Sequence, residues 1–332
     1  MRTLVADRFP AQALAALANQ GVDVAYLPEL ATATLADELA GADILVVRST
    51  RVPAEVIDHP HAASLRLIIR AGSGTDTIDV AAASARALPV ANVPGRNAIA
   101  VAELAFALML ALDRQVVTQT LELRDGQWRK ADFQACRGIF GRRVGVVGLG
   151  DIGLAFAERA AAFGCEIFSL RRPNRPPTIE ERITSIGIAQ FDDMYDLANA
   201  CDVVSFHVPL CDETARMINS GFISCLQPGT ILINTARGEL IDEDALLPAL
   251  DNKPLFVGLD VYPGEPTAGR TSFSSRLAQH PNVIGTHHVG ASTLQAQHAV
   301  ADAVVAMIDE FSRGRLPACV NQAAVTARSQ PA

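Results

Sequence analysis

Three glycines that follow an apolar run have the spacing needed to bind a dinucleotide. Gly148, Gly150 and Gly153 form a GxGxxG pattern directly after residues 143–147. The first glycine permits a tight turn, the second lets backbone approach a pyrophosphate, and the third lets the next helix pack closely. That helix offers unpaired N–H groups to a phosphate at its N-terminus. The candidate contacts at this turn are Gly148, Gly150, Asp151, Ile152 and Gly153.

A lone GxGxxG pattern is weak evidence, so the neighbouring elements matter. Apolar positions between residues 152 and 163 predict a helix, and Gly164 can end it in the left-handed conformation. A second apolar strand, residues 166–170, then completes a βαβ unit of the usual length. This context favours a dinucleotide-binding unit.

Polar residues stand at or near the ends of the strands that follow. Residues 203–208, 231–235, 256–261 and 283–286 read as further strands of one doubly wound parallel sheet. Ligands of such sheets bind at the carboxyl ends of the strands. The polar residues there are His207, Arg237, Asp260, Glu265 and His288.

The first hundred residues predict a separate α/β layer. Short apolar runs at residues 22–26, 44–47, 67–69 and 89–91 indicate strands, and residues 11–19 indicate a helix. Residues 98–113 then form a strongly apolar helix, too short for a bilayer span and suited to domain linking or subunit packing. The segment 114–142 is polar and largely without periodicity.

Composition narrows the function classes. A chain of 332 residues fits two domains, and a net charge of -8 argues against nucleic acid as a partner. The six cysteines lack metal-ligand spacing and read as reduced thiols, so we expect no metal and a cytoplasmic location. Neither a signal peptide nor a membrane-spanning segment is expected.

Several motifs occur together in a fixed order along nearly the whole chain. They lie at residues 70–76, 92–95, 148–153, 234–240, 260–266 and 288–293. In this combination the chain resembles the D-isomer-specific 2-hydroxyacid dehydrogenases. The resemblance implies two doubly wound parallel-sheet domains, with a Rossmann cofactor domain (97–292) inserted into a flavodoxin-like substrate domain (1–96 and 293–332). It also implies a homodimer joined through the cofactor domain. The chain is expected to have no room for the regulatory domain of some phosphoglycerate dehydrogenases.

The resemblance assigns catalytic roles to three residues. Arg237 would bind the substrate carboxylate and polarise the carbonyl, and His288 would exchange the proton. Glu265 would accept the other N–H of His288 and orient its ring. Each residue alone has an ordinary structural reading, an interdomain salt bridge in the case of Arg237.

Further contacts are carried over from the family less directly. The expected cofactor contacts beyond the glycine turn are Ser73, Arg171, Arg172, His207, Val208, Pro209, Thr235, Ala236, Asp260 and Gly290. The expected substrate contacts are Arg48, Ser49, Gly72, Ser73, Gly74, Arg237 and His288. A plain turn is an equally good reading of residues 48–50.

The chain departs from the family pattern at two places. His287 stands where members usually have Pro, and it reads as a structural or rim histidine. Arg171 and Arg172 stand where NAD-preferring members carry an acidic residue for the ribose hydroxyls. A guanidinium can bind a 2′-phosphate through two hydrogen bonds, so NADP is favoured, with NAD possible. The competing reading of these arginines is a solvated basic turn.

The sequence therefore favours an NADP-preferring reductase of small 2-keto acids, with glyoxylate or hydroxypyruvate as substrate. One alternative is a short-type D-3-phosphoglycerate dehydrogenase or a phosphite-type dehydrogenase. A formate dehydrogenase is disfavoured, since those enzymes pair their His with Gln. From another class, co-repressors of this fold bind NAD(H) as a signal. The lack of long disordered segments disfavours that role.

Overall fold

The computed structural model describes residues 1–266 and 270–329. The chain divides into two compact units. Unit 1 comprises Met1–Asn97 and Ser292–Ala332, and unit 2 comprises Ala98–Ala291. Unit 2 is thus an insertion between the two parts of unit 1.

Unit 1 is built on a five-stranded parallel sheet. Its strands are β1 (Arg2–Val5), β2 (Asp23–Tyr26), β3 (Ile44–Val47), β4 (Leu67–Arg70) and β5 (Val90–Asn92). Their spatial order, β2-β1-β3-β4-β5, is the flavodoxin-like order. All four residues of β3 are buried, as expected for a central parallel strand covered on both faces.

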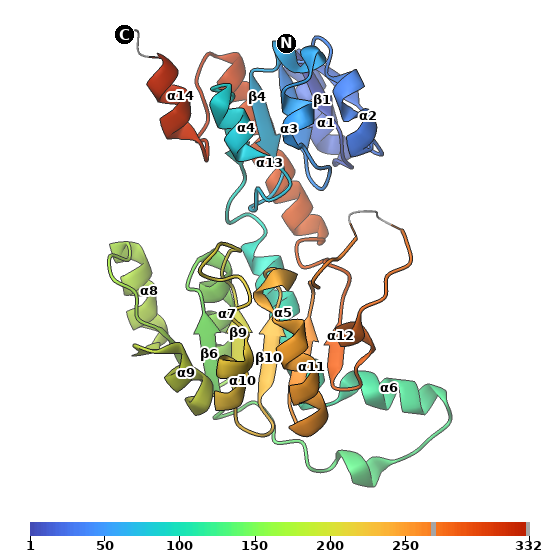
Figure 1. Cartoon of the computed structure of the whole chain (residues 1–332), viewed down its shortest axis with the longest axis vertical. Coiled ribbons are helices and arrows are strands. Elements are labelled where there is room, and N and C mark those ends of the chain that lie inside the picture. The colour runs from blue at the N-terminus through green and yellow to red at the C-terminus, as the bar shows by residue number, and fades with distance from the viewer. Residues whose placement is uncertain (267–269, 330–332) are drawn as a thin grey trace. The chain divides into compact units, whose positions relative to one another are not determined.

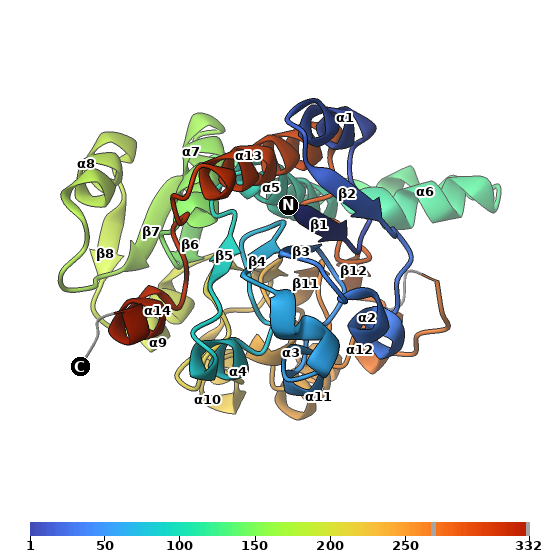
Figure 2. The ribbon, with the colours of Figure 1, turned by 90° about the horizontal axis from the view of Figure 1, so that it is seen from above.

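Helices cover both faces of this sheet. They are α1 (Ala11–Asn19), α2 (Thr32–Glu38), α3 (Ala54–Ile57), η1 (Pro60–Ser64), α4 (Val80–Ala85), α13 (Leu294–Ser312) and α14 (Gln322–Ser329). Helices α1 and α13 lie on one face, and α2, α3 and α4 lie on the other (Figure 2). Val300, Val304 and Ile308 of α13 complete the first of these two cores. The C-terminal part of the chain is therefore needed for the core of the first part.

Unit 2 contains a seven-stranded parallel sheet. Its strands are β6 (Arg143–Val147), β7 (Glu166–Leu170), β8 (Ala189–Phe191), β9 (Val203–Phe206), β10 (Ile231–Asn234), β11 (Phe256–Leu259) and β12 (Val283–Gly285). The order is β12-β11-β10-β9-β6-β7-β8, so the strand order reverses between β6 and β9. This is the Rossmann arrangement, in which the crevice at the switch point receives the dinucleotide. The two sheets confirm the predicted fold class.

Unit 2 contains α-helices and short 3₁₀-helices, most of which form two layers around its sheet. They are α5 (Ala98–Asp113), α6 (Val116–Arg124), η2 (Lys130–Phe133), α7 (Asp151–Ala162), α8 (Pro177–Ile186), α9 (Met194–Ala200), α10 (Ser220–Cys225), η3 (Gly238–Leu240), α11 (Glu243–Asn252) and α12 (Arg276–Gln279). In Figure 1, α9, α10 and α11 lie in front of the sheet, and α5 and α7 lie behind it. Each layer has its own buried apolar core. Both faces of the strands are thereby removed from water.

The elements differ from the sequence prediction at a few places. Strands β1 and β8 were not predicted, since only two of the four residues of β1 are apolar and β8 is a three-residue edge strand with little burial. Helix α6 lies in the segment that lacks clear periodicity, and none of its residues is buried. Within the part of the chain that the structure describes, no helix has the length and apolar character to cross a bilayer.

A buried ion pair fixes the end of α5 to the start of the Rossmann sheet. The Arg142 guanidinium donates to Asp113 at 2.5 Å, and both side chains are nearly inaccessible, at 7% and 1% exposure. Arg142 also donates through Nε to the Gly138 carbonyl at 2.8 Å. Breaking a buried pair by removing one partner leaves an uncompensated charge.

We therefore expect Asp113→Asn to lower the free energy of unfolding of unit 2 by about 3–5 kcal/mol. The matched control is Glu158→Gln, which breaks the exposed ion pair with Arg182 and should cost less than about 1 kcal/mol. Urea unfolding followed by circular dichroism measures both. Equal effects of the two substitutions would contradict the structural role of the buried pair.

Candidate active site

The glycine turn has the shape that a dinucleotide requires. Gly148 has a φ of +101°, and a Cβ there would meet the His207 carbonyl oxygen at 2.5 Å. At Gly153 a Cβ would meet the Gly148 carbonyl oxygen at 1.8 Å. At Gly150, by contrast, a Cβ meets no described atom within 4 Å. The first and third glycines are thus required by the protein itself, and the second faces open space.

Helix α7 begins at this open space without a side-chain cap. Its N-cap residue is Gly150, so no side chain accepts from the first N–H groups of the helix. Asp151 is exposed in the first turn, and Ile152 is partly buried against the core. An uncapped helix N-terminus next to a backbone turn with room in front of it is suited to a phosphate. The turn therefore fits a pyrophosphate.

Two buried polar atoms near the ends of the central strands lack partners among the described residues. They are Nδ1 of His207, after β9, and Oγ1 of Thr235, after β10. Val208 is buried beside Gly148, and the Pro209 carbonyl accepts from Thr214 Oγ1 at 2.7 Å. Buried polar groups normally have a hydrogen-bond partner. The two orphan atoms fit a site for a bound polar group.

The backbone after β10 is folded into a turn that presents Arg237. Asn234 is 2% exposed; its Oδ1 accepts from the Ala236 N–H at 3.0 Å, and its Nδ2 donates to the Arg237 carbonyl at 2.8 Å. Gly238 allows the Tyr262 backbone to approach, since a Cβ there would meet the Tyr262 carbonyl carbon at 2.1 Å. The turn after β10 is thereby packed against the loop that carries Glu265.

The loop after β12 is held by one buried carboxylate. Asp260, at the end of β11, is 1% exposed and accepts from the Thr286 hydroxyl at 2.6 Å. It also accepts from the N–H groups of Val289 and Gly290, each at 2.8 Å. Its carbonyl accepts from the His288 N–H at 2.7 Å. His288 itself adopts a φ of +52°, an uncommon conformation for a residue other than glycine.

His288 and Glu265 are joined by a hydrogen bond. Nδ1 of His288 contacts Oε1 of Glu265, while Oε2 of Glu265 accepts from the Tyr262 N–H at 3.1 Å. Burial raises the pKa of Glu265, but the hydrogen bond and charge of His288 outweigh burial and hold that pKa below its ordinary value. The Arg237 charge contributes in the same direction. Arg237, Glu265 and His288 therefore lie close enough to interact electrostatically, and all three belong to unit 2.

His287, directly before this pair, is exposed. Among the described residues, no contact gives its side chain a chemical role.

Ala236, which was predicted to contact the cofactor, is partly buried and packs against the core of unit 2.

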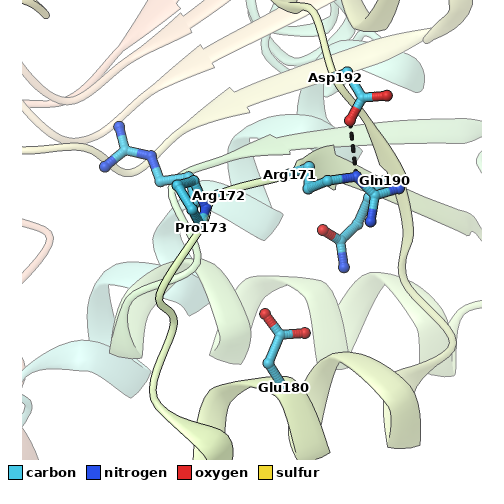
Figure 3. Close-up of a pocket in the computed structure, with 6 residues that line it drawn as sticks. All are labelled: Arg171, Arg172, Pro173, Glu180, Gln190 and Asp192. Atoms are coloured by element: carbon cyan, nitrogen blue, oxygen red, sulfur yellow. Dashed lines mark hydrogen bonds and ion pairs between the residues drawn. The ribbon is translucent and has the colours of Figure 1, made fainter.

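A pocket of unit 2 surrounds the end of β7 (Figure 3). It has a volume of about 450 Å³ and is lined by Arg171, Arg172, Pro173, Glu180, Gln190 and Asp192. Nε of Arg171 donates to Asp192 at 2.7 Å, and both side chains are largely exposed. Figure 3 shows the Arg171 and Arg172 side chains directed to opposite sides of the strand end. The pocket lining thus carries two guanidinium groups and two carboxylates.

Arg175, which was not predicted as a site residue, supports the strand end beside this pocket. Its guanidinium donates to the Leu170 carbonyl at the end of β7 and to Gln190 at 3.1 Å. It lies 3.7 Å from Glu180, and burial lowers its pKa. The only signal in the sequence was a third arginine in the same turn.

The predicted substrate loops lie in unit 1. The N–H groups of Arg48, Ser49 and Thr50 all donate to Oδ2 of Asp7, at 2.6, 3.1 and 3.1 Å. The Arg48 guanidinium reaches Ser292 Oγ at 3.4 Å. The Asp7 carboxylate thus fixes the backbone conformation of residues 48–50 through three hydrogen bonds.

The second loop of unit 1 contains Gly72, Ser73 and Gly74. Ser73 donates to Asn97 at 2.8 Å, and its carbonyl accepts from Asn92 at 2.6 Å. Gly72 has a φ of +157°, and the Arg70 guanidinium fills the place of its Cβ. Two polar loops held by hydrogen bonds therefore follow β3 and β4.

The fold and these sites define a family. The sequence model of the D-isomer specific 2-hydroxyacid dehydrogenase, NAD binding domain, matches residues 106–290. The chain belongs to the D-isomer specific 2-hydroxyacid dehydrogenase family.

Individual relatives carry three different enzyme names. The chain is 37% identical to a D-3-phosphoglycerate dehydrogenase of Methanocaldococcus jannaschii over 95% of its own length, but it spans only 58% of that relative. It is 38% identical to a hydroxypyruvate reductase of Thermotoga maritima, over 80% of this chain and 83% of the relative. A glyoxylate reductase of Thermococcus litoralis is 34% identical over 85% and 84% of the two chains.

Solved structures agree with the fold. The TT0316 protein of Thermus thermophilus superimposes with a TM-score of 0.83 at 34% identity, covering 96% of this chain and 99% of that one. An acyclic imino acid reductase, solved in complex with NADPH and D-Arg, has a TM-score of 0.82 at 25% identity, with 97% and 99% coverage.

Buried His207 makes the stability of the folded chain depend on pH. Burial lowers the pKa of His207 to about 3, whereas an unfolded His titrates near pH ~6.5. Between these values the unfolded chain binds a proton that the folded chain excludes, so stability falls as the pH decreases through this window. The slope reaches at most about 1.4 kcal/mol per pH unit.

We expect His207→Asn to lose less stability than the wild type when the pH is lowered from 7 to 5. Urea midpoints measured at both pH values test this. His298→Asn, at an exposed position of α13, is the control and should follow the wild type. Parallel pH profiles of wild type and His207→Asn would show that His207 is not the group responsible.

Proposed function

We propose that this protein is a nicotinamide-dependent reductase of small 2-keto acids. The observation that carries the proposal is the His288–Glu265 pair with the Arg237 charge beside it, in the unit that contains the glycine turn. Reduction of a 2-keto acid needs a proton donor, a cation for the carboxylate, and a hydride donor. The first two are side chains of this site, and a bound nicotinamide would supply the third.

Glu265 determines which nitrogen of His288 is reactive. Because Nδ1 contacts Glu265, Nε2 is the nitrogen left to meet the substrate. In reduction, the carbonyl oxygen takes the proton from Nε2 while its carbon takes the hydride, and the resulting neutral imidazole is reprotonated from solvent. Arg237 holds the substrate carboxylate through charge-assisted hydrogen bonds and stabilises the developing alkoxide. In oxidation His288 acts as the base.

We propose that other residues position this machinery and the cofactor. Asp260 positions His288 through the loop after β12, rather than by contact with the nicotinamide carboxamide alone. The turn from Gly148 to Gly153 would bind the pyrophosphate, and the orphan atoms of His207 and Thr235 would form hydrogen bonds with the bound cofactor. The family resemblance supports the loops at residues 48–50 and 72–74 as substrate contacts.

Glyoxylate and hydroxypyruvate are the substrates we favour. The support comes from the relatives named hydroxypyruvate reductase and glyoxylate reductase, which the chain covers over most of their length. The similarity to D-3-phosphoglycerate dehydrogenases supports a second candidate, phosphohydroxypyruvate. A cytoplasmic location is also proposed, and the six free cysteines support a reducing compartment.

We favour NADP because of the pocket at the end of β7. The Arg171–Asp192 pair is exposed, so its net stabilisation is small and a phosphate can replace the carboxylate at little cost. A guanidinium binds phosphate through two parallel hydrogen bonds. The acyclic imino acid reductase solved with NADPH is a precedent within the same fold.

We also propose a homodimer. Large apolar side chains are exposed on α6 and along the segment after it: Val116, Val117, Leu121, Leu123, Trp128 and Phe140. Large exposed apolar groups of this kind are typical of an interaction surface. A second copy of the chain is the partner we expect.

Initial rates with glyoxylate, hydroxypyruvate, pyruvate and phosphohydroxypyruvate, each with NADPH and NADH, test the proposed activity. We expect turnover of at least one of the first two acids with NADPH. His288→Asn should lower kcat by about 100- to 10,000-fold while the cofactor dissociation constant stays nearly unchanged. Full activity of this variant, or no turnover of any 2-keto acid by the wild type, would refute the proposal.

Arg171→Asp should shift cofactor preference toward NADH. The variant loses a guanidinium that can bind the 2′-phosphate and gains a carboxylate that repels it. We therefore expect kcat/KM for NADPH, divided by kcat/KM for NADH, to fall by at least about 10- to 100-fold. The control is Arg182→Asp, on α8 outside the pocket residues. A variant that keeps its NADPH preference would remove Arg171 from the recognition of the phosphate.

Leu121→Asp should weaken the dimer, because it buries a charge in the proposed apolar interface. Sedimentation velocity should give twice the chain mass for the wild type and a concentration-dependent shift toward the monomer for the variant. Leu294→Asp changes an exposed leucine of unit 1 and serves as the control. A monomeric wild type would contradict the proposal.

A further inference from the structure

Unit 1 contains a group of three potential metal ligands that plays no part in the proposed reaction. Asp37 lies on α2, His59 immediately precedes η1, and His61 lies within η1. One ligand atom from each residue lies within 4.8 Å of the other two. This is the one such group of three or more among the residues that the structure describes. We propose that Asp37, His59 and His61 bind a divalent first-row transition ion, with Zn²⁺ as the reference case.

The chemistry of the three side chains fits this class of ion. Imidazole nitrogen and carboxylate oxygen are ordinary Zn²⁺ ligands, whereas Mg²⁺ and Ca²⁺ select oxygen alone. Two neutral imidazoles and one carboxylate leave a fourth position for water. Ligand atoms around a tetrahedral Zn²⁺ are separated by about 3.4 Å. Asp37 and His61 are exposed. Small rotations of their side chains can therefore shorten the separation of the ligand atoms from at most 4.8 Å to about 3.4 Å.

The two histidines are held close together before any ion binds. Their rings meet edge to face, with 4.8 Å between the ring centroids. Pro60 lies between them and restricts the backbone, and the His61 N–H donates to Nδ1 of His59 at a long 3.3 Å. A metal on either ring nitrogen of His59 would replace this weak bond: on Nδ1 directly, or on Nε2 because the remaining ring proton then lies on Nδ1, which can no longer accept. The pair is therefore partly preorganised.

The backbone that carries the histidines is braced on both sides. The Arg86 guanidinium donates to the carbonyls of Ile57 and Ala62, which flank the pair. Ser64 at the end of η1 donates to the Ala42 carbonyl at 3.0 Å, and Ala42 follows α2 closely. Helices α2 and α3 cover the same face of the unit 1 sheet (Figure 2). A bound ion would link α2 to η1 and stabilise unit 1.

Isothermal titration calorimetry tests the site: the full chain is first treated with a chelator to remove metal and is then titrated with Zn²⁺ alone. We expect one Zn²⁺ to bind each wild-type chain. The dissociation constant should rise at least about 10-fold in His59→Asn and in Asp37→Asn. Losing a residue that only hydrogen-bonds to a metal ligand already weakens metal binding by that factor, so losing a ligand should weaken it at least as much. The amide introduced by His59→Asn can still cap η1 by accepting from the N–H groups of its first turn, so the fold is kept. His298→Asn, an exposed histidine of α13, is the matched control and should bind like the wild type.

Thermal unfolding gives a second readout that does not depend on catalysis. Zn²⁺ should raise the unfolding temperature of the wild type and of His298→Asn, and it should raise that of His59→Asn and Asp37→Asn much less. Absence of Zn²⁺ binding to the wild type would overturn the proposal. Equal binding by all the variants would also overturn it, because the ion would then occupy another place, such as the His288–Glu265 pair.

Discussion

The arrangement of the candidate site depends on the buried carboxylate of Asp260. A carboxylate at 1% exposure is costly unless hydrogen bonds replace its lost water. Here the Thr286 hydroxyl and the N–H groups of Val289 and Gly290 do so. These bonds tie the end of β11 to the loop after β12. They also offset the backbone strain of His288, whose left-handed conformation costs on the order of 1–3 kcal/mol.

The site is therefore assembled from three neighbouring strand ends. Parallel strands place their carboxyl ends at one edge of the sheet, which brings the loops after β10, β11 and β12 together. Gly238 then allows the turn that carries Arg237 to touch the Tyr262 backbone, and Glu265 folds back onto that same residue. Side chains distant in sequence thus share one local electric field. The polarity of that field, cation and carboxylate around an imidazole, suits proton exchange with a carboxylate substrate.

The fold class could be predicted because its determinants are local. Apolar runs such as Ile44–Val47 and the glycine spacing at 148–153 are visible in a single sequence. The edge strand Ala189–Phe191 was not predicted, since it is short and little buried. The supports of the site were also out of reach: the bonds of Asp260 and Asn234 and the bracing role of Arg175 exist only in the folded chain. The chemical roles of Arg237, Glu265 and His288 remain predictions from the family resemblance and their geometry.

The insertion of unit 2 within unit 1 imposes an order on biosynthesis. The ribosome completes the strands β1 to β5 first, yet Val300, Val304 and Ile308 of α13, which cover one side of them, emerge only after all of Ala98–Ala291. Until then Val5, Ile44 and Leu67 lack part of their apolar covering. A nascent chain with such a surface is prone to aggregate or to recruit chaperones. Unit 2, whose chain is continuous, can mature earlier than the unit that begins before it.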